Sequence, residues 1–385
     1  MNRLVVCSWS LAFCSGLGCA ADPPAAVAED VTGDAGRSET SSGAAASVGD
    51  SEGGDPTRDA SSGQSADDGS SGGPVATTEG EPTGDTSTTG GEEQREPEEP
   101  LRFIAMGDAG EGNAAQYDVA AAIEQVCADK GGCEFVLYLG DNFYNDGVSS
   151  VQDDQFQTKF EMPYADLSMP FYAAMGNHDY GELSFLWHKL DYEVEYTNYS
   201  DKWVMLDKWY TVDQYPNLDV FVMDTTRLMW NHETNAQRNW LDAQIAASDK
   251  AWKIAIGHHP YLSNGRHGNA GNYEGLPFPP QVAGTTVKSV MDDSLCGKVD
   301  LYLAGHDHNR QWLQPTCGGG LTTHFIVSGA GCKTTSFSHH GGGSPVFWED
   351  DTTPGFLVLE LTSTSIHGEF YDRDGVFEFA HDIVK

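Results

Sequence analysis

Short apolar runs that end in glycine recur along the chain from residue 101 onward. Five such runs, of four to six residues, each lead into a glycine and then into polar residues, at 103–106, 135–139, 171–175, 252–256 and 299–304. Runs of this length bounded by glycine are typical of buried strands. Further strands are predicted at 221–223, 324–328, 356–361 and 366–371.

Helical periodicity lies between some of these runs. Asn113 is placed to cap a helix over 114–128 that ends before Gly131, and Asn235 is placed to open a second helix that contains Leu241. Strands that alternate with helices, each strand ending in a polar loop, predict an α/β (α+β) fold with its site at the carboxyl edge of the sheet.

Composition divides the chain into unequal parts. From Ala20 to Pro100 there is no Phe, Trp, Tyr, Leu, Ile or Met, and nineteen acidic residues stand against three arginines. Such a segment cannot bury enough apolar surface to offset the entropy of ordering its backbone. We therefore predict a disordered acidic Gly/Ser/Thr-rich linker over 20–100 and one domain over 101–385.

The N-terminus has the features of an export signal over 1–19. Arg3 is followed by an uncharged run too short to span a bilayer. Gly-Leu-Gly-Cys at 16–19 resembles a bacterial lipobox, which implies a lipid anchor at Cys19 and a lipoprotein at the outer membrane or cell surface. Cleavage near Ala20 or Ala21 would instead release a periplasmic or secreted protein.

Export makes disulfide bonds possible. Five cysteines follow the predicted signal, and close spacing favours the pairs Cys127–Cys133 and Cys296–Cys317, which leaves Cys332 unpaired. Other pairings remain open, because spacing does not fix connectivity.

Polar residues at the ends of the five apolar runs are the candidate chemistry. A single Gly-Asp after a strand is usually a turn in which Asp bonds its own backbone, and an isolated histidine pair is usually a surface feature. Five such clusters in succession are not explained as independent turns, so we predict that they form one shared site. The clusters contain Asp108, Asp141, Asn177-His178, His258 and His306-x-His308.

These clusters resemble the calcineurin-like metallophosphoesterases and, within them, the purple acid phosphatases of the small, tartrate-resistant type. The matching blocks are Gly-Asp-Ala-Gly (107–110), Gly-Asp-Asn-Phe-Tyr (140–144), Gly-Asn-His-Asp (176–179), Gly-His-His-Pro (257–260) and Gly-His-Asp-His-Asn (305–309). The resemblance implies a four-layer sandwich of two mixed β-sheets flanked by helices, with metals at one sheet edge.

The resemblance also implies two metal sites that share one carboxylate. A two-metal phosphoesterase holds its ions about 3.5–4 Å apart to clamp the attacking and leaving oxygens, and a bridging carboxylate fixes that separation. The implied bridge is Asp141. The implied partners are Asp108, Tyr144 and His308 in one site, and Asn177, His258 and His306 in the other.

Tyr144 distinguishes this chain from other phosphoesterases of the superfamily. A phenolate is a hard, strongly donating oxygen that stabilises a trivalent ion. The implied cofactor is therefore a binuclear centre of ferric iron and a divalent ion, with iron, zinc and manganese all compatible with the second site.

Two further histidines are implied to act in catalysis. His178 follows a predicted ligand and is implied to contact the substrate phosphate or protonate the leaving oxygen, with Asp179 as its orienting partner. His267 matches a second family histidine with a similar role. His259 departs from the aromatic residue of mammalian members and has no assigned role.

We expect an exported acid phosphatase that hydrolyses phosphate monoesters. The alternative on the same fold is a divalent-metal phosphodiesterase or nucleotidase, and a further one is a binding protein without turnover. The net charge of −37 argues against nucleic acid as a partner. A small phosphorylated substrate stays compatible, because bound metals invert the local field. The sequence does not identify the physiological substrate or the oligomeric state.

Overall fold

The computed structural model describes residues 99–315, 317, 320 and 322–385. These belong to a compact unit that spans Thr89–Lys385. The predicted signal at 1–19, the lipobox with Cys19 and nearly all of the predicted linker lie outside the described residues. Across the described part of the chain, no helix is long and apolar enough to span a membrane.

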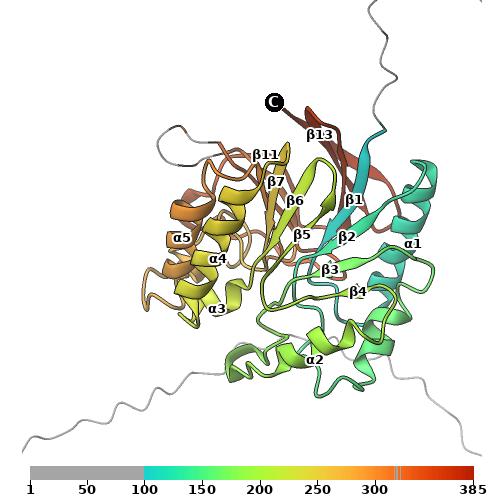
Figure 1. Ribbon diagram of the computed structural model, residues 1–385, viewed down its shortest axis with the longest axis horizontal. Coiled ribbons are helices and arrows are strands. Elements are labelled where there is room, and N and C mark those ends of the chain that lie inside the picture. The colour runs from blue at the N-terminus through green and yellow to red at the C-terminus, as the bar shows by residue number, and fades with distance from the viewer. Residues whose placement is uncertain (1–98, 316, 318–319, 321) are drawn as a thin grey trace, which may run out of the picture. The chain divides into compact units, whose positions relative to one another are not determined.

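The first of two seven-stranded sheets contains the first and the last strand of the described part of the chain (Figure 1). Its strand order is β14-β13-β12-β1-β2-β3-β4, in which β1 to β4 run parallel and β12 pairs antiparallel with β1. The strands are β1 (Leu101–Met106), β2 (Phe135–Tyr138), β3 (Phe171–Ala173), β4 (Trp203–Val204), β12 (Gly355–Leu361), β13 (Ser365–Asp372) and β14 (Phe377–Val384).

The second sheet has the order β11-β9-β10-β8-β7-β6-β5. Its centre, β6-β7-β8-β10, is parallel, and antiparallel strands lie at both edges. The strands are β5 (Tyr210–Tyr215), β6 (Leu218–Val222), β7 (Trp252–Ile256), β8 (Leu301–Ala304), β9 (Arg310–Leu313), β10 (His324–Ser328) and β11 (Val346–Asp350).

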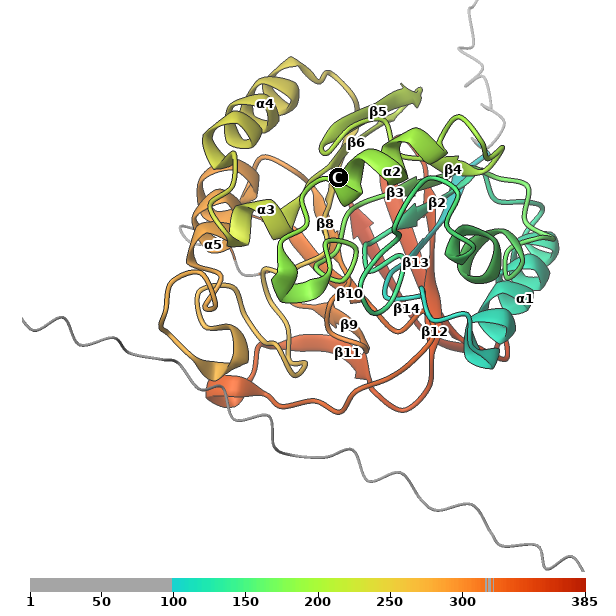
Figure 2. The ribbon, with the colours of Figure 1, turned by 90° about the horizontal axis from the view of Figure 1, so that it is seen from below.

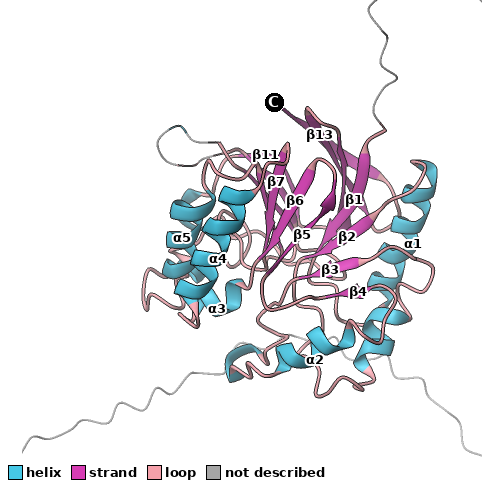
Figure 3. Ribbon diagram, viewed as in Figure 1, coloured by secondary structure: helices cyan, strands magenta, loops and turns pink. Residues whose placement is uncertain are grey.

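Helices flank the two sheets and complete the predicted four layers (Figure 3). Helix α1 (Ala114–Asp129) lies beside the first sheet. Its N-cap is Asn113, whose side chain accepts a hydrogen bond from the Gln116 amide. The helices beside the second sheet are α3 (Thr225–Met229), α4 (Thr234–Ala247) and α5 (Thr285–Val290), while α2 (Lys189–Tyr196) follows the loop after β3.

The central strands of the second sheet are buried on both faces, which explains their largely apolar runs. Along β7, Ile254 and Ile256 join the core between the sheets, whereas Ala255 joins the core beneath the helices. Successive side chains of a strand point to opposite faces, so a strand covered on both sides is apolar at most of its positions.

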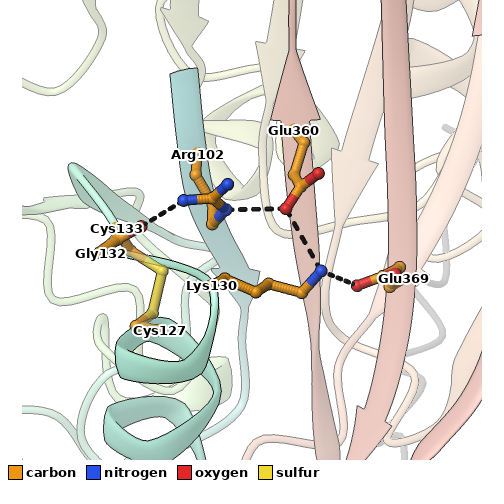
Figure 4. The surroundings of a disulfide bond; sticks show 7 residues. All are labelled: Arg102, Cys127, Lys130, Gly132, Cys133, Glu360 and Glu369. Carbon is orange, nitrogen blue, oxygen red and sulfur yellow. Dashed lines mark hydrogen bonds and ion pairs between the residues drawn. A yellow bond between two sulfur atoms is a disulfide. The ribbon is translucent and has the colours of Figure 1, made fainter. Parts of the chain in front are cut away.

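Both predicted disulfides are present, and Cys332 is a buried free thiol. Cys127–Cys133 joins the end of α1 to the loop before β2 (Figure 4). Beside it, Arg102 pairs with Glu360 and Lys130 bridges the same carboxylate to Glu369 on β13, so ion pairs tie α1 and three strands together (Figure 4).

Candidate metal centre

All seven predicted metal ligands follow the carboxyl ends of strands from the two sheets. Parallel strands bring their carboxyl ends to the same edge of a sheet, and Figure 2 looks toward this edge of both. The first sheet supplies Asp108 after β1, Asp141 and Tyr144 after β2, and Asn177 after β3; the second supplies His258 after β7, and His306 and His308 after β8.

Three of these side chains form one cluster of donor atoms. The hydroxyl of Tyr144 donates to Asp108 Oδ1 at 2.9 Å and lies 3.2 Å from His308 Nε2. Asp108 Oδ1 and His308 Nε2 are 3.5 Å apart. A phenol oxygen, a carboxylate and an imidazole thus converge on one point.

The other four side chains form a second cluster around His258 Nε2. This atom lies 3.0 Å from Asn177 Oδ1, 3.1 Å from His306 Nδ1 and 3.3 Å from Asp141 Oδ2. Ligand atoms of Asp141, His258 and His306 all lie within 4.8 Å of one another, a spacing that can hold a metal ion. The structure therefore brings these four predicted ligands together.

Two of the histidines are oriented by hydrogen bonds at the ring nitrogen that faces away from the donor clusters. His258 Nδ1 donates to the Leu139 carbonyl at 3.0 Å, so Nε2 is the ring nitrogen that faces the cluster. His308 Nδ1 lies 3.0 Å from Thr335 Oγ1, so its Nε2 faces Tyr144. Partners of this kind fix the tautomer and orientation of metal-binding histidines.

The backbone adopts left-handed conformations at three of the candidate ligands. Asp108, Asp141 and His306 have φ values of 57°, 53° and 68°. Such φ values are uncommon outside glycine and concentrate at functional sites. Two glycines make room for the carboxylates, because a Cβ at Gly176 would lie 2.1 Å from Asp141 Oδ1 and one at Gly305 would lie 2.4 Å from Asp108 Oδ2.

The electrostatics of the two clusters fit a bound cation. Burial and then the Asp108 and Asp141 charges raise the pKa of Tyr144 well above its ordinary value. Burial opposes charging of His258, but Asp141 and Asp108 raise its pKa to about 9. The buried carboxylates thus draw protons onto their neighbours, and an ion among these oxygen and nitrogen donors would take the place of those protons.

His178 is partly exposed and lies beside Asp141, and its predicted relation to Asp179 is wrong. Its ring Nδ1 donates to the Asn145 carbonyl at 2.7 Å, and its backbone amide donates to Asp141 Oδ1 at 2.9 Å. Asp179 is fully buried and accepts from the amides of Gly176 and Phe143 at 2.7 and 2.9 Å. It therefore shapes the loops that carry the ligands rather than orienting His178.

His267 also reaches the centre, through residues that the sequence did not single out. Its ring stacks on His306 with centroids 4.0 Å apart, and its Nδ1 pairs with Glu274. Its backbone amide donates at 2.7 Å to Asp307, which is 1% exposed. Asp307 stands between two predicted ligands in the chain and so holds the His267 loop against them.

His259 takes a structural place beside the centre. Its Nδ1 lies 2.9 Å from Thr225 Oγ1, and its ring packs on His306 at 4.4 Å between centroids. Thr225 Oγ1 also accepts from the amides of His258 and His259 at 3.1 and 2.9 Å. This threonine at the start of α3 thereby fixes the turn after β7.

Comparison with known proteins agrees with this geometry. The calcineurin-like phosphoesterase family model matches residues 101–310. Human tartrate-resistant acid phosphatase type 5 is 29% identical over 71% of this chain and 88% of its own length, and the rabbit protein of the same name is 30% identical over the same shares. Purple acid phosphatase 3 of Arabidopsis thaliana is 27% identical, over 71% of this chain and 75% of its own.

Solved structures share the fold. Purple acid phosphatase PPD1 from yellow lupin superimposes with a TM-score of 0.55 at 17% identity, over 74% of this chain and 54% of its own. GAP50, described as the anchor in the inner membrane complex of Plasmodium, superimposes with a TM-score of 0.58 at 22% identity, over 74% and 89%. The chain belongs to the calcineurin-like phosphoesterase family and, within it, is a metal-dependent phosphoesterase of the purple acid phosphatase type.

Proposed function

We propose that this protein is an exported acid phosphatase that hydrolyses small phosphate monoesters at a binuclear metal centre. The observation that carries the proposal is the meeting of two donor clusters, Asp108, Tyr144 and His308 in one and Asp141, Asn177, His258 and His306 in the other. The two clusters adjoin, because the His306 backbone amide donates to Asp108 Oδ2 at 2.8 Å. Two-metal hydrolysis needs paired sites of this kind.

The first cluster would hold ferric iron and the second a divalent ion, either iron, zinc or manganese. The phenolate oxygen of Tyr144 favours the trivalent ion, whereas the amide, imidazole and carboxylate donors of the second cluster do not select among divalent metals. When bound, the metal pair supplies an activated nucleophile and neutralises charge on the phosphoryl group.

The chain's own residues supply the proton for the leaving oxygen. The Nδ1–H of His178 is held by the Asn145 carbonyl, so its Nε2 is directed toward Asp141, 4.0 Å from Oδ2. A proton on Nε2 would reach the departing alkoxide of an ester bound there. His267, fixed by Glu274 and Asp307, is the second candidate donor.

The proposal places the protein outside the cytoplasm. Two disulfide bonds, Cys127–Cys133 and Cys296–Cys317, are consistent with folding in an oxidising environment. The predicted signal over 1–19 would direct export, and lipidation of Cys19 would anchor the domain to a membrane through the acidic linker over 20–100. The net charge of −37 on the chain makes nucleic acid an unfavourable partner.

Metal analysis of purified protein, with a visible spectrum and a phosphate-ester panel, tests the proposal. We expect iron together with a second metal, monoesterase activity at acidic pH, and a visible band that disappears in Tyr144→Phe. Tyr138→Phe, at another buried tyrosine outside the clusters, should keep the band. Diester hydrolysis by a colourless divalent enzyme would favour the phosphodiesterase alternative, and inactivity with both sites loaded would favour a binding protein.

A further inference from the structure

A lysine lies against the ring of the proposed phenolate ligand. Lys333 Nζ is 3.2 Å from the centroid of the Tyr144 ring and 2.6 Å from Glu111 Oε1. Tyr144 is only 3% exposed, whereas the Lys333 side chain is 27% exposed. An ammonium group therefore covers a nearly buried ring, and a carboxylate pairs with that ammonium group.

The backbone around Lys333 is attached to the loop that carries Asp108. The Gly331 amide donates to the Gly107 carbonyl at 3.0 Å, and the Cys332 thiol donates to the Asp108 carbonyl at 2.9 Å. The Asn113 side chain donates to the Cys332 carbonyl at 3.1 Å. Lys333 is thus positioned by the same loop as the first metal cluster.

Charge over the ring must change how strongly the phenolate donates electrons. A cation on an aromatic face is attracted by the ring, and the attraction is greater when the ring carries negative charge. The cation therefore lowers the energy of the phenolate electrons, so the phenolate donates less electron density to a bound metal. The metal bound to such a phenolate receives less charge and stays a stronger Lewis acid.

We propose that Lys333 is a positioning residue that sets the donor strength of Tyr144 toward the metal of the first cluster. Glu111 acts in the opposite sense, because its carboxylate offsets part of the ammonium charge. The inference rests on the proposed ferric–tyrosinate bond. It adds two residues, both outside the predicted ligand set, that adjust the electronic state of the centre.

The visible charge-transfer band and the reduction potential of the iron test this role without reference to turnover. Lys333→Met removes the charge at similar length, so the band should move to longer wavelength and the potential should fall. Lys333→Arg keeps the charge and should leave both near the wild-type values. Glu111→Gln removes the opposing charge, so the band should move to shorter wavelength and the potential should rise.

Lys208→Met is the matched control. Lys208 also lies over an aromatic ring, Trp209, at 4.6 Å and pairs with a carboxylate, Glu233, at 2.8 Å, but it is not in contact with either cluster. All variants are compared at equal metal content, and Lys208→Met should match the wild type in both readouts.

The possible failures are distinguishable. A band that is present, is abolished in Tyr144→Phe and stays in place in both Lys333→Met and Glu111→Gln overturns the role of Lys333 alone. A wild-type protein that binds iron without any such band overturns the phenolate bond and this inference together. If Lys333→Met does not fold, the opposite shift in Glu111→Gln still decides the question.

Discussion

His178 is the residue whose loss should separate chemistry from metal binding. Its ring is held by the Asn145 carbonyl and lies outside both donor clusters. We expect His178→Asn to lower kcat about 10²-fold, the usual scale for removing a general acid. The metal content and the visible band should not change. Steady-state kinetics with metal analysis check this, and a variant that loses metal would show that His178 supports the centre instead.

Asp307 should matter to catalysis although it is not a proposed ligand. Its carboxylate accepts from the His267 amide at 2.7 Å and from the Ser263 hydroxyl, which fixes the loop behind His267. Asp307→Asn directs an amide N–H at one of these donors, so His267 should shift. We expect kcat/KM to fall about 10-fold, since small displacements of catalytic groups are costly. A variant that keeps full kcat/KM would contradict this role.

Residue types and spacing located six of the seven proposed ligands, but not the residues that support them. Asp108, Asp141, Asn177, His258, His306 and His308 stand in the clusters that end the apolar runs, whereas Tyr144 and the division into two sites were implied by the family resemblance. Asp179 was assigned to His178 because the two are neighbours in the sequence. Their side chains diverge in the turn after Asn177, and the Asp179 carboxylate accepts hydrogen bonds from backbone amides instead. Glu274 carries no signal of its own, since it meets His267 only through the fold of an irregular loop.

Gly176→Ala should remove the metal centre while keeping the fold. The new Cβ would lie 2.1 Å from Asp141 Oδ1 and 2.2 Å from the Asp141 amide, so the loops after β2 and β3 must separate. We expect loss of bound metal and activity with native secondary structure, measured by metal analysis and circular dichroism.

Gly131→Ala is the control for this substitution. Nothing lies within 4 Å of a Cβ at Gly131, although its φ of 90° strains any side chain. It should cost about 1 kcal/mol of stability and leave the metal content unchanged. Normal metal content in Gly176→Ala would show that the loops can adapt.

Most central strands were predictable, whereas the edge strands and β9 were not. The runs at 252–256 and 324–328 coincide with β7 and β10, because strands buried on both faces are apolar at most positions. Strand β9 (Arg310–Leu313) is equally buried but begins with a charged residue, whose guanidinium pairs with Asp350 on the neighbouring strand β11 and with Glu378 on β14 of the other sheet. Only the folded chain supplies those partners. Asn235, predicted to open the second helix, lies inside α4, whose N-cap is Glu233 and whose first residue is Thr234.

The metal centre joins the two sheets, so metal should stabilise the whole domain. Asp108, Tyr144 and Asn177 come from the first sheet, and His258 and His308 come from the second. A ligand that binds only the folded state at about 1,000 times its Kd adds about 4 kcal/mol. We expect chelation to lower the Tm and re-addition of metal to restore it. An unchanged Tm after complete metal removal would mean that the sheets are held together without the ions.

Acid should weaken the domain through a histidine far from the metals. Burial, and then the charge of His381 against the opposing charge of Asp300, lowers the pKa of His324 to about 4. The unfolded chain binds this proton near pH 6.5, so the folded state holds fewer protons between about pH 6.5 and 4 and loses stability as the pH falls through that window. The side chain is partly exposed, so we expect an effect of about 1–2 kcal/mol.

His324→Leu should remove this contribution. The variant should lose less Tm than the wild type between pH 7.5 and 4.5, while at pH 7.5 the two should be similar, because within the described residues Nδ1 of His324 has no hydrogen-bond partner to lose. Thermal unfolding of both proteins at the two pH values measures the difference. Parallel loss of Tm in the two proteins would place the acid sensitivity elsewhere. At the acidic pH where an acid phosphatase works, His324 at the start of β10 therefore opposes folding. The ion pairs and disulfides elsewhere in the domain must outweigh this loss of stability.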